Sequence, residues 1–404
     1  MNAPFTDNSE SLPEFSIGKP VRRSEDPALV QGMGRYSDDV SVAGQAYGAM
    51  ARSRHAHGAI KAIDTTDARA MPGVLAVYTG ADLAAYTPAK SPFPLKSDDG
   101  SPMLGNGTMF FATDKARYVG DPIALVVAET EAQAREAAEA VAVEIDSLPA
   151  TVDARAAVAP GAPQLYPDVP SNIALDHTLG DMAKAQAIIA GARHVARLRI
   201  VDNRVMVAAM EPRAALFEYD AAQQRFTAHM QSQGVFGMRN GLAAAMGVTP
   251  DKMHVLTSQV GGSFGMKGSV FPEYIALLHA ARDLGRPVKF TEMRSESFVS
   301  DHQGRDHDVD AELALDADGN ILALRMTGYA NLGAYMTPFG VLIGAINIHR
   351  NAQSVYRTPV IATNIKCVLT NTPPIGAYRG AGRPEGNYIM ERVIEEAARV
   401  SGVD

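Results

Sequence analysis

The spacing of apolar and polar residues predicts short strands mixed with helices in the first part of the chain. Val-Leu-Ala-Val-Tyr at 74–78 and Ile-Ala-Leu-Val-Val-Ala-Glu at 123–129 are apolar runs of strand length. Residues 131–140 have the composition and apolar spacing of a helix, and 141–145 follow as another strand. This order predicts a small α+β domain that ends near residue 155.

A second region of strands and helices is predicted from about residue 172 onward. Two of its helices should end at glycines, Gly247 and Gly285, and one hairpin should turn at Asp318 and Gly319. The expected strands are 214–220, 225–231, 255–260, 309–315 and 321–326, and the expected helices are 234–246 and 272–284.

A segment rich in proline and glycine, 158–170, lies between the two regions. Proline lacks a backbone N–H and fixes φ, so this segment fits neither a helix nor a central strand. The sequence therefore predicts a flexible leader at 1–20, a first domain at 21–155, a linker at 156–171 and a second domain at 172–404.

Composition limits the class of protein. The 404 residues suffice for roughly two to three domains, and 46% hydrophobic residues are typical of a globular core. A net charge of −8 speaks against a nucleic-acid partner, which needs a basic surface. The longest apolar run, 339–348, is too short to span a bilayer, and no apolar signal core follows Arg22 and Arg23. We therefore expect a cytoplasmic protein without a membrane span.

The single cysteine, Cys367, excludes a disulfide framework, a four-cysteine zinc site and an iron–sulfur cluster held by this chain alone. It lies in the strand-like run 365–370, where a buried structural thiol is expected rather than a nucleophile.

Two histidine pairs are present, His55 with His57 and His302 with His307. No cysteine or carboxylate with metal-site spacing accompanies either pair. Ordinary hydrogen-bonded histidines are therefore favoured over a zinc or iron site.

The segment 376–385 (Gly-Ala-Tyr-Arg-Gly-Ala-Gly-Arg-Pro-Glu) is a glycine-rich loop that leads into a helix expected from residue 387. Its arginines, Arg379 and Arg383, would lie near a helix N-terminus. Backbone N–H groups and guanidinium forks at such a place suit an anion or an oxo ligand. The alternative is a tight loop whose arginines pair with surface carboxylates.

A second glycine loop, 261–268 (Gly-Gly-Ser-Phe-Gly-Met-Lys-Gly), follows a predicted strand. It is not a Walker loop, because Gly268 rather than serine or threonine follows Lys267, and it lacks the dinucleotide pattern of spaced glycines. The loop is either a structural turn or a place where backbone amides approach an anionic cofactor.

Two further polar residues admit simple structural roles. Glu211, in Met-Glu-Pro-Arg, is a lone carboxylate that would pair with Arg213 or another arginine. Gln233 stands at an expected helix start, where a hydrogen bond to backbone is the default. There is no G-x-S-x-G elbow, so a serine hydrolase of the α/β type is unsupported.

Taken together, five stretches resemble the xanthine dehydrogenase and aldehyde oxidase family, in particular molybdopterin-binding large subunits similar to that of carbon monoxide dehydrogenase. The resemblance runs from about residue 18 to the end and implies an α+β fold, with an α/β hammerhead domain followed by the first molybdopterin-binding domain. The stretches are Arg-Arg-Ser-Glu-Asp-Pro (22–27), Lys-Ala-Arg-Tyr-Val-Gly-Asp-Pro (115–122), Met-Glu-Pro-Arg-Ala-Ala-Leu (210–216), Val-Gly-Gly-Ser-Phe-Gly-Met-Lys (260–267) and Ala-Tyr-Arg-Gly-Ala-Gly-Arg-Pro-Glu (377–385).

The resemblance implies two catalytic residues. Gln233 matches a glutamine that hydrogen-bonds an oxygen ligand of molybdenum, and Arg379 matches the arginine of the active-site loop. Because the pterin dithiolene holds the metal, no side chain is an expected metal ligand. The implied reaction oxidises an aldehyde or an N-heteroaromatic substrate with water as oxygen donor. The implied cofactor-binding residues are Gln233, Gly262, Ser263, Phe264, Gly265, Arg379 and Gly380.

The implied cofactor is molybdopterin cytosine dinucleotide, and separate [2Fe-2S] and FAD subunits would receive the electrons in a heteromeric complex. Family large subunits continue for about as long again beyond the position of Asp404. A second chain is therefore expected to supply a C-terminal molybdopterin domain, without which this chain would be inactive. An interrupted gene or a shortened product would give the same sequence.

Two positions depart from related enzymes. Gly380 stands where carbon monoxide-oxidising members carry a copper-binding cysteine, and Gly268 stands where purine-oxidising members carry a glutamate. The resemblance therefore implies neither carbon monoxide nor xanthine as substrate.

Two other functions remain open. One is a non-catalytic remnant or scaffold that keeps the fold but binds no molybdenum, against which Gln233, Phe264 and Arg379 speak. The other is a nucleotide-binding dehydrogenase, which lacks a complete dinucleotide fingerprint.

Overall fold

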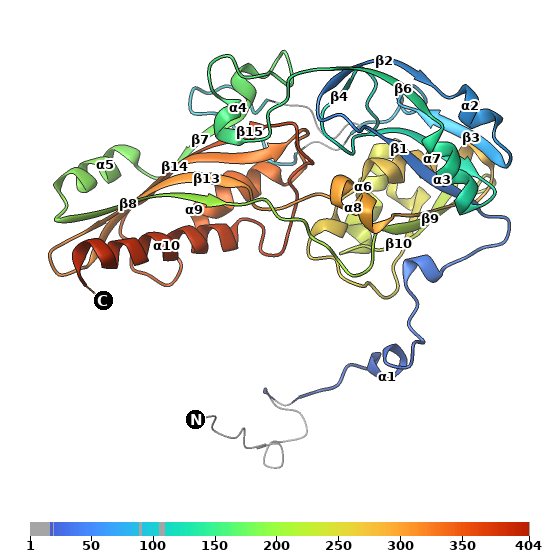
Figure 1. The fold of residues 1–404 in the computed structure, drawn as a ribbon. Coiled ribbons are helices and arrows are strands. Elements are labelled where there is room, and N and C mark those ends of the chain that lie inside the picture. The colour runs from blue at the N-terminus through green and yellow to red at the C-terminus, as the bar shows by residue number, and fades with distance from the viewer. Residues whose placement is uncertain (1–16, 19, 89–90, 105–109, 404) are drawn as a thin grey trace.

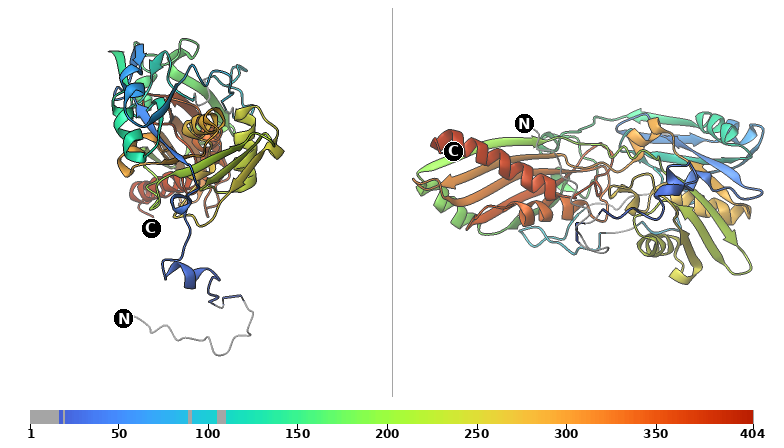
Figure 2. Two further views of the ribbon diagram at one scale, coloured as in Figure 1. Left: turned by 90° about the vertical axis from the view of Figure 1, so that its right-hand side faces the viewer. Right: turned by 90° about the horizontal axis from the view of Figure 1, so that it is seen from below.

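The computed structural model describes residues 17–18, 20–88, 91–104 and 110–403. Two lobes lie end to end, one built on a seven-stranded sheet and the other on a five-stranded sheet (Figures 1 and 2). The predicted leader at 1–20 falls almost entirely outside the described residues. After it, the short helix α1 (Asp26–Leu29) lies away from both lobes (Figure 1).

The seven-stranded sheet combines strands from both predicted domains, in the order β11-β10-β9-β12-β1-β5-β3. The parallel pairing of β1 with β12 joins them, with Ala46 opposite Val288. The boundary near residue 155 therefore does not separate two independent sheets. The strands are β1 (Ala46–Arg52), β3 (Val74–Thr79), β5 (Pro122–Ala128), β9 (Ala214–Asp220), β10 (Arg225–Met230), β11 (Met253–Leu256) and β12 (Val288–Thr291).

Helices cover this sheet on both faces. Alternate residues of β5 point to opposite sides, and all of them are buried, so both faces need a partner. Leu125 and Val127 pack in the core formed with α6 (Val235–Met246) and α7 (Pro272–Leu284). Ala124 and Val126 pack toward α3 (Glu131–Glu139) on the other side, where α2 (Thr66–Ala70) also lies. As predicted, α6 and α7 end at glycines in the left-handed conformation. A separate three-stranded sheet contains β4 (Lys115–Ala116), β2 (Gly58–Asp64) and β6 (Ala142–Ser147).

The five-stranded sheet has the order β7-β15-β14-β13-β8. The predicted hairpin is confirmed, since β13 and β14 pair antiparallel around a turn that contains Gly319. Helix α10 (Arg383–Ser401) covers one face with Ile389, Met390 and Val393, and α5 (Met182–Gly191) covers the other. The strands are β7 (Ile173–Leu179), β8 (His194–Asp202), β13 (His307–Leu315), β14 (Ile321–Gly333) and β15 (Ile361–Leu369).

Cys367 lies in the core beneath α10, in the predicted strand. Burial raises the pKa of its thiol to about 12, which keeps it protonated and agrees with a structural role.

The predicted linker at 156–171 packs closely against both lobes. It begins within the short helix α4 (Ala154–Ala157) and ends within the short 3₁₀ helix Pro170–Asn172. The Tyr166 hydroxyl donates to the Ala334 carbonyl at 2.8 Å, and the Arg117 guanidinium lies 4.7 Å from the centre of the Tyr166 ring. Leu165 and Val169 are buried beside it. The apolar residues among the prolines thus anchor this connection.

Several predicted bounds differ from the structure. The strand predicted at 255–260 lies at Met253–Leu256 and stops before the glycine loop. The C-terminal helix begins at Arg383 rather than at residue 387, because Gly382 serves as its N-cap. The apolar run 339–348 forms a largely buried helical segment with a π-type turn at Leu342–Asn347, followed by α9 (Ile348–Asn351). Among the described residues, no helix has the length and apolarity to cross a membrane.

A buried carboxyl joins the two lobes. Asp121 accepts hydrogen bonds from the Tyr335 hydroxyl and from the Arg117 N–H, both at 2.9 Å. Burial raises the pKa of Asp121 to about 7, although these donors and nearby arginines oppose the rise.

We expect Asp121→Asn to change the pH dependence of stability. A carboxyl whose folded pKa lies near 7 and whose unfolded pKa lies near 3.8 stabilises the fold at low pH and loses that contribution as pH rises between the two values. Between about pH 5 and about pH 8 the loss is about 2–3 kcal/mol, and the Asn variant escapes it. Denaturant unfolding at both pH values measures the difference.

A variant whose stability differs from wild type equally at both pH values would contradict the raised pKa. Tyr335→Phe serves as a companion, because it removes a donor that favours the charged carboxylate, which should raise the pKa of Asp121 further and enlarge the loss of stability at the higher pH.

Candidate cofactor site

Three segments meet where the two lobes contact each other. They are the start of α6 with Gln233, the glycine loop 261–268 and the loop 376–382 before α10. The first two belong to the lobe with the seven-stranded sheet, and the third belongs to the other lobe. The Arg379 N–H donates to the Phe264 carbonyl at 2.8 Å and joins the two loops.

The Gln233 side chain is fixed by the first loop. Its Oε1 accepts from the Ser263 hydroxyl and from the Gly265 N–H, both at 2.7 Å. A backbone N–H can only donate, so the amide oxygen must face the loop and the amide nitrogen is left to donate outward. The expected hydrogen bond to backbone is present, but it goes to the neighbouring loop rather than to α6 itself.

The loop 261–268 contains three residues with positive φ, a conformation that favours glycine and strains other residues. Gly262 and Gly265 have φ of 102° and 98°, and Phe264 between them has φ of 49°. A Cβ on Gly265 would lie 2.7 Å from the Ala377 carbonyl oxygen. Glycine at this position therefore lets the second loop approach, while Phe264 keeps a conformation of the kind that clusters at functional sites.

Lys267 anchors the loop from beneath. Its buried ammonium donates to the Glu211 carbonyl at 2.7 Å and contacts Glu211 Oε2 at 3.2 Å. The same carboxylate oxygen accepts the Gly261 N–H at 2.7 Å. Burial lowers the pKa of Lys267, although Glu211 opposes this. The interpretation of Glu211 as a partner of Arg213 or another arginine was wrong, because a lysine and a loop amide take that place.

Arg379 lies exposed at the edge of the site, with its guanidinium 5.9 Å from the centre of the Phe264 ring. Within the described ranges, no carboxylate forms an ion pair with Arg379 or with Arg383. The alternative of surface ion pairs therefore fails for both arginines. Arg383 donates to the Gly380 carbonyl at 3.0 Å, at the first position of α10.

A hollow of about 590 Å³ opens beside these loops. Apolar side chains, glycine backbone and Arg379 all contribute to its lining. Its lining residues are Val207, Ala208, Met210, Gly261, Gly262, Phe264, Tyr378 and Arg379. A larger hollow of about 640 Å³ lies near Arg52 and Met293, and none of the predicted site residues lines it.

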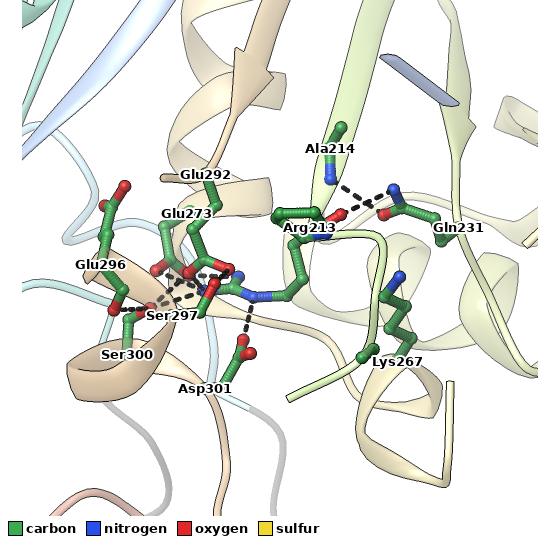
Figure 3. Close-up of polar contacts among 12 residues, drawn as sticks. Arg213, Ala214, Gln231, Lys267, Glu273, Glu292, Glu296, Ser297, Ser300 and Asp301 are labelled. Carbon is green, nitrogen blue, oxygen red and sulfur yellow. Dashed lines mark hydrogen bonds and ion pairs between the residues drawn. The ribbon is translucent and has the colours of Figure 1, made fainter. Parts of the chain in front are cut away.

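A buried charge cluster surrounds Arg213 (Figure 3). The Arg213 guanidinium, which is fully buried, lies among the carboxylates of Glu273, Glu292 and Asp301. The Arg213 Nε donates to Asp301 at 2.6 Å, and Arg52 reaches Glu273 at 2.6 Å. Arg213 belongs to the 210–216 stretch and directly precedes β9, so the cluster fixes the start of that strand.

The charges in this cluster depend on one another. Burial alone would raise the pKa of Glu273, but Arg213 and Arg52 lower it to about 2. Burial raises the pKa of Asp301 to about 6 despite its contact with Arg213. This cluster was not predicted from the sequence. Its one visible signal was Glu273, an acidic residue at the start of a helix whose first two turns are otherwise apolar.

Gln231 connects the backbone on either side of Arg213 to the segment that leads to Gln233. Gln231 accepts the Ala214 N–H at 2.9 Å and donates to the Pro212 carbonyl at 3.1 Å (Figure 3). It stands two residues before Gln233, between the end of β10 and the start of α6. The backbone that leads to Gln233 is thus tied to the segment beside Arg213.

The four histidines of the two pairs noted in the sequence have structural partners. The His302 ring stacks on Phe271 with centres 4.4 Å apart, and burial lowers its pKa to about 4. His57 Nδ1 contacts the Pro149 carbonyl at 2.7 Å and His307 Nε2 contacts the Gly344 carbonyl at 3.2 Å. His55 contacts the Ser147 hydroxyl at 3.0 Å.

Comparison with known proteins identifies both halves of the chain. Residues 31–149 match the aldehyde oxidase and xanthine dehydrogenase a/b hammerhead domain, and residues 165–404 match a molybdopterin cofactor-binding domain. The second match spans more than half of the chain. These ranges support the predicted order of the two domains.

Relatives and solved structures agree with these matches. The 6-hydroxypseudooxynicotine dehydrogenase complex subunit gamma of Paenarthrobacter nicotinovorans is 33% identical over 399 residues, and the alignment covers 96% of this chain and 48% of that protein. The carbon monoxide dehydrogenase large chain of Afipia carboxidovorans is 32% identical over 400 residues, covering 95% of this chain and 48% of that protein.

Among solved structures, quinoline 2-oxidoreductase from Pseudomonas putida 86 superposes with a TM-score of 0.87 at 31% identity, over 95% of this chain and 48% of that one. The chain thus spans about half the length of the relatives that it matches. It belongs to the xanthine dehydrogenase and aldehyde oxidase family of molybdopterin-dependent oxidoreductases.

Proposed function

We propose that the chain is the N-terminal half of the molybdenum-binding large subunit of a molybdenum hydroxylase. Its substrate is an aldehyde or an N-heteroaromatic compound, oxidised with water as oxygen donor. Electrons pass to separate iron–sulfur and flavin subunits. The names of relatives that act on nicotine derivatives and quinoline support the N-heteroaromatic alternative.

The observation that carries this proposal is the orientation of Gln233. Its amide oxygen is occupied by Ser263 and Gly265, so the amide nitrogen is left to donate toward a ligand beside the loop. A glutamine donor does not titrate near neutral pH, so it suits a negatively charged oxygen ligand at any working pH. The residues of this chain therefore fit a molybdopterin cofactor at this place.

Each site residue has a role that follows from its surroundings. Gln233 would donate to an oxygen ligand, and the backbone of 262–265 would lie against the cofactor. Arg379, which has no carboxylate partner in the described part of the chain, would place its positive charge beside an anionic group. Gly380 would complete the loop. The cofactor, when bound, supplies the two-electron oxidation, while these residues bind and orient.

The shape of the hollow narrows the substrate. Val207, Met210 and Phe264 give it an apolar wall that suits a flat aromatic ring. Gly380 and Gly268 carry no side chain, so neither a sulfur ligand for a second metal nor a carboxylate for a purine is available at these two positions. These features favour an aldehyde or a small heteroaromatic over carbon monoxide or xanthine.

The proposal includes a second chain that supplies the C-terminal molybdopterin domain, in a cytoplasmic heteromer. Support comes from the relatives, which are about twice as long as the matched region. The cofactor would be the cytosine dinucleotide form, and [2Fe-2S] and FAD would sit on other subunits. The single cysteine of this chain agrees with clusters held elsewhere.

The deciding experiment purifies the tagged chain from its native host and determines the native mass, the molybdenum content and the cytosine nucleotide content together. Molybdenum and the nucleotide in a complex with a second chain would establish the proposal. A metal-free chain of its own mass would overturn it and favour a scaffold that keeps the fold without the metal.

We expect Arg379→Ala to lower turnover of the reconstituted enzyme by about 10²–10³-fold, as is typical when one preorganised donor of an active site is removed. The fold should be unaffected, because the guanidinium is exposed and makes no ion pair within the described residues. Steady-state kinetics measure the effect. Arg383→Ala is the matched control, since within the described residues the one hydrogen bond of that side chain goes to the Gly380 carbonyl. Equal turnover in the two variants would count against a role for Arg379.

A further inference from the structure

A second arginine, Arg305, reaches the Arg379 loop from the neighbouring segment. Its Nη2 donates to the Arg379 carbonyl at 2.9 Å, and its Nη1 contacts the Tyr378 carbonyl at 3.3 Å. Its guanidinium lies 4.7 Å from the centre of the Tyr378 ring. Two consecutive carbonyls of the site loop are therefore held by one side chain that does not itself line the hollow.

Arg305 is anchored by a buried carboxylate. Its Nη1 also donates to Glu385 Oε1 at 3.0 Å. Glu385 is fully buried in the first turn of α10, where the helix dipole favours a negative charge. Its second oxygen, Oε2, has no hydrogen-bond partner within the described ranges. Removing the cation would leave an unpaired charge buried in the protein, which costs much free energy. The ion pair therefore holds the Arg305 guanidinium in place.

The backbone at Arg305 has an unusual conformation that brings this residue next to the Arg379 loop. Arg305 and Asp306 have φ of 64° and 74°, in the left-handed region that residues other than glycine rarely adopt. A Cβ on Gly304 would lie 2.6 Å from the Tyr378 Cβ. The two segments are also joined by the Gly376 N–H, which donates to the Gln303 carbonyl at 2.9 Å. Strained backbone that persists beside a site indicates that its surroundings require it.

We propose that Arg305 is a positioning residue which, together with Glu385, fixes the backbone of 378–380 and thereby aims the Arg379 side chain. Only an arginine offers a planar fork that serves two carbonyls and a carboxylate at once. What Arg379 then does rests on the proposed function. The fixing of the loop is a property of this chain alone and is testable on it.

Hydrogen exchange of the purified chain is the test. The reporters are the Arg379 and Ala381 N–H groups, which donate to the Phe264 and Tyr378 carbonyls at 2.8 Å. In Arg305→Gln these two amides should exchange at least about tenfold faster than in wild type, because the loop opens locally without unfolding the lobe. Arg305→Lys, which keeps the charge but not the fork, should give an intermediate rate.

Arg155→Gln is the matched control. Arg155 bonds Asp308 through Nε and Nη2 at 2.7 and 2.8 Å and also reaches Asp310, in the same lobe, but contacts neither loop. If Arg305 does not hold the loop, the exchange rates of the 379 and 381 amides should be the same in all variants. That result, or equal acceleration in Arg155→Gln, would overturn the proposal. Should Arg305→Gln not fold, Arg305→Lys decides by the same comparison.

The outcome is separable from the proposed function. Exchange rates need no molybdenum, so fast exchange in Arg305→Gln with a chain that never binds the metal would retain the positioning role and reject the proposed enzyme. In the loaded enzyme, the Arg305 variants should lower kcat more than they raise KM, because the side chain touches the loop and not the substrate hollow.

Discussion

Arg213→Met is expected to lower the free energy of unfolding by about 3–5 kcal/mol, the cost typical of removing one partner from a buried ion pair. The guanidinium is fully buried and is the contact shared by Glu273, Glu292 and Asp301. Without it, Arg52 is the one cation left beside Glu273 among the described residues, and Glu292 and Asp301 keep no ion-pair partner there. Denaturant unfolding monitored by circular dichroism measures the loss.

The matched control is Arg197→Met. Arg197 pairs with Glu312 at 3.0 Å, but its side chain is 62% exposed, so water replaces the contact and the cost should stay below about 1 kcal/mol. Equal losses in the two variants would mean that burial of the cluster contributes nothing. Arg213→Lys should fall between them, since one ammonium cannot replace a fork that reaches three carboxylates.

Gly265→Val is expected to separate the two site loops. The new Cβ would lie 2.7 Å from the Ala377 carbonyl oxygen, and the φ of 98° is unsuited to a branched residue. The loop movement would break the Gln233 to Gly265 bond and the Arg379 to Phe264 bond. Under the proposed function, bound molybdenum should then fall by about tenfold or more, since displacements of about 1 Å at a site have effects of that size.

Metal analysis of the purified complex measures this loss. Gly285→Val is its control, because Gly285 has φ of 61° with open space around its Cα, so that variant bears the backbone strain alone. Full molybdenum content in Gly265→Val would show that the loop contact does not matter. A loss of similar size in Gly285→Val would show that strain, not the loop contact, is responsible.

Local pattern was enough to predict many elements of the fold. Helices α6 and α7 end at Gly247 and Gly285 as predicted, because a left-handed C-terminal residue is a local requirement that glycine meets. The β13–β14 hairpin was equally readable, since its alternation and its turn lie close together in the chain. The order of the five motifs identified the family, which the hammerhead and molybdopterin-domain matches confirm.

What local pattern could not give was pairing between distant residues. Glu211 was assigned to an arginine because Arg213 is its neighbour in sequence, yet Arg213 turns into the buried cluster and Lys267 takes Glu211. The start of α10 was placed late because glycine and proline at 382 and 384 resemble a loop, although both suit a helix N-terminus. The contact of Arg305 with the Arg379 loop has no sequence signal, because the two residues lie 74 positions apart in the chain.

The pairing of β1 with β12 has a consequence for how the polypeptide is made. Ala46 leaves the ribosome long before Val288, its partner in the sheet. Until then, one edge of β1 has no neighbour, and its backbone N–H and C=O groups are open to pairing with other chains. During synthesis, the seven-stranded sheet therefore stays incomplete until β12 has been made. The exposed edge of β1 favours aggregation during that time. Because pairing between strands this far apart in the chain must wait for loop closure, we expect folding to be slow.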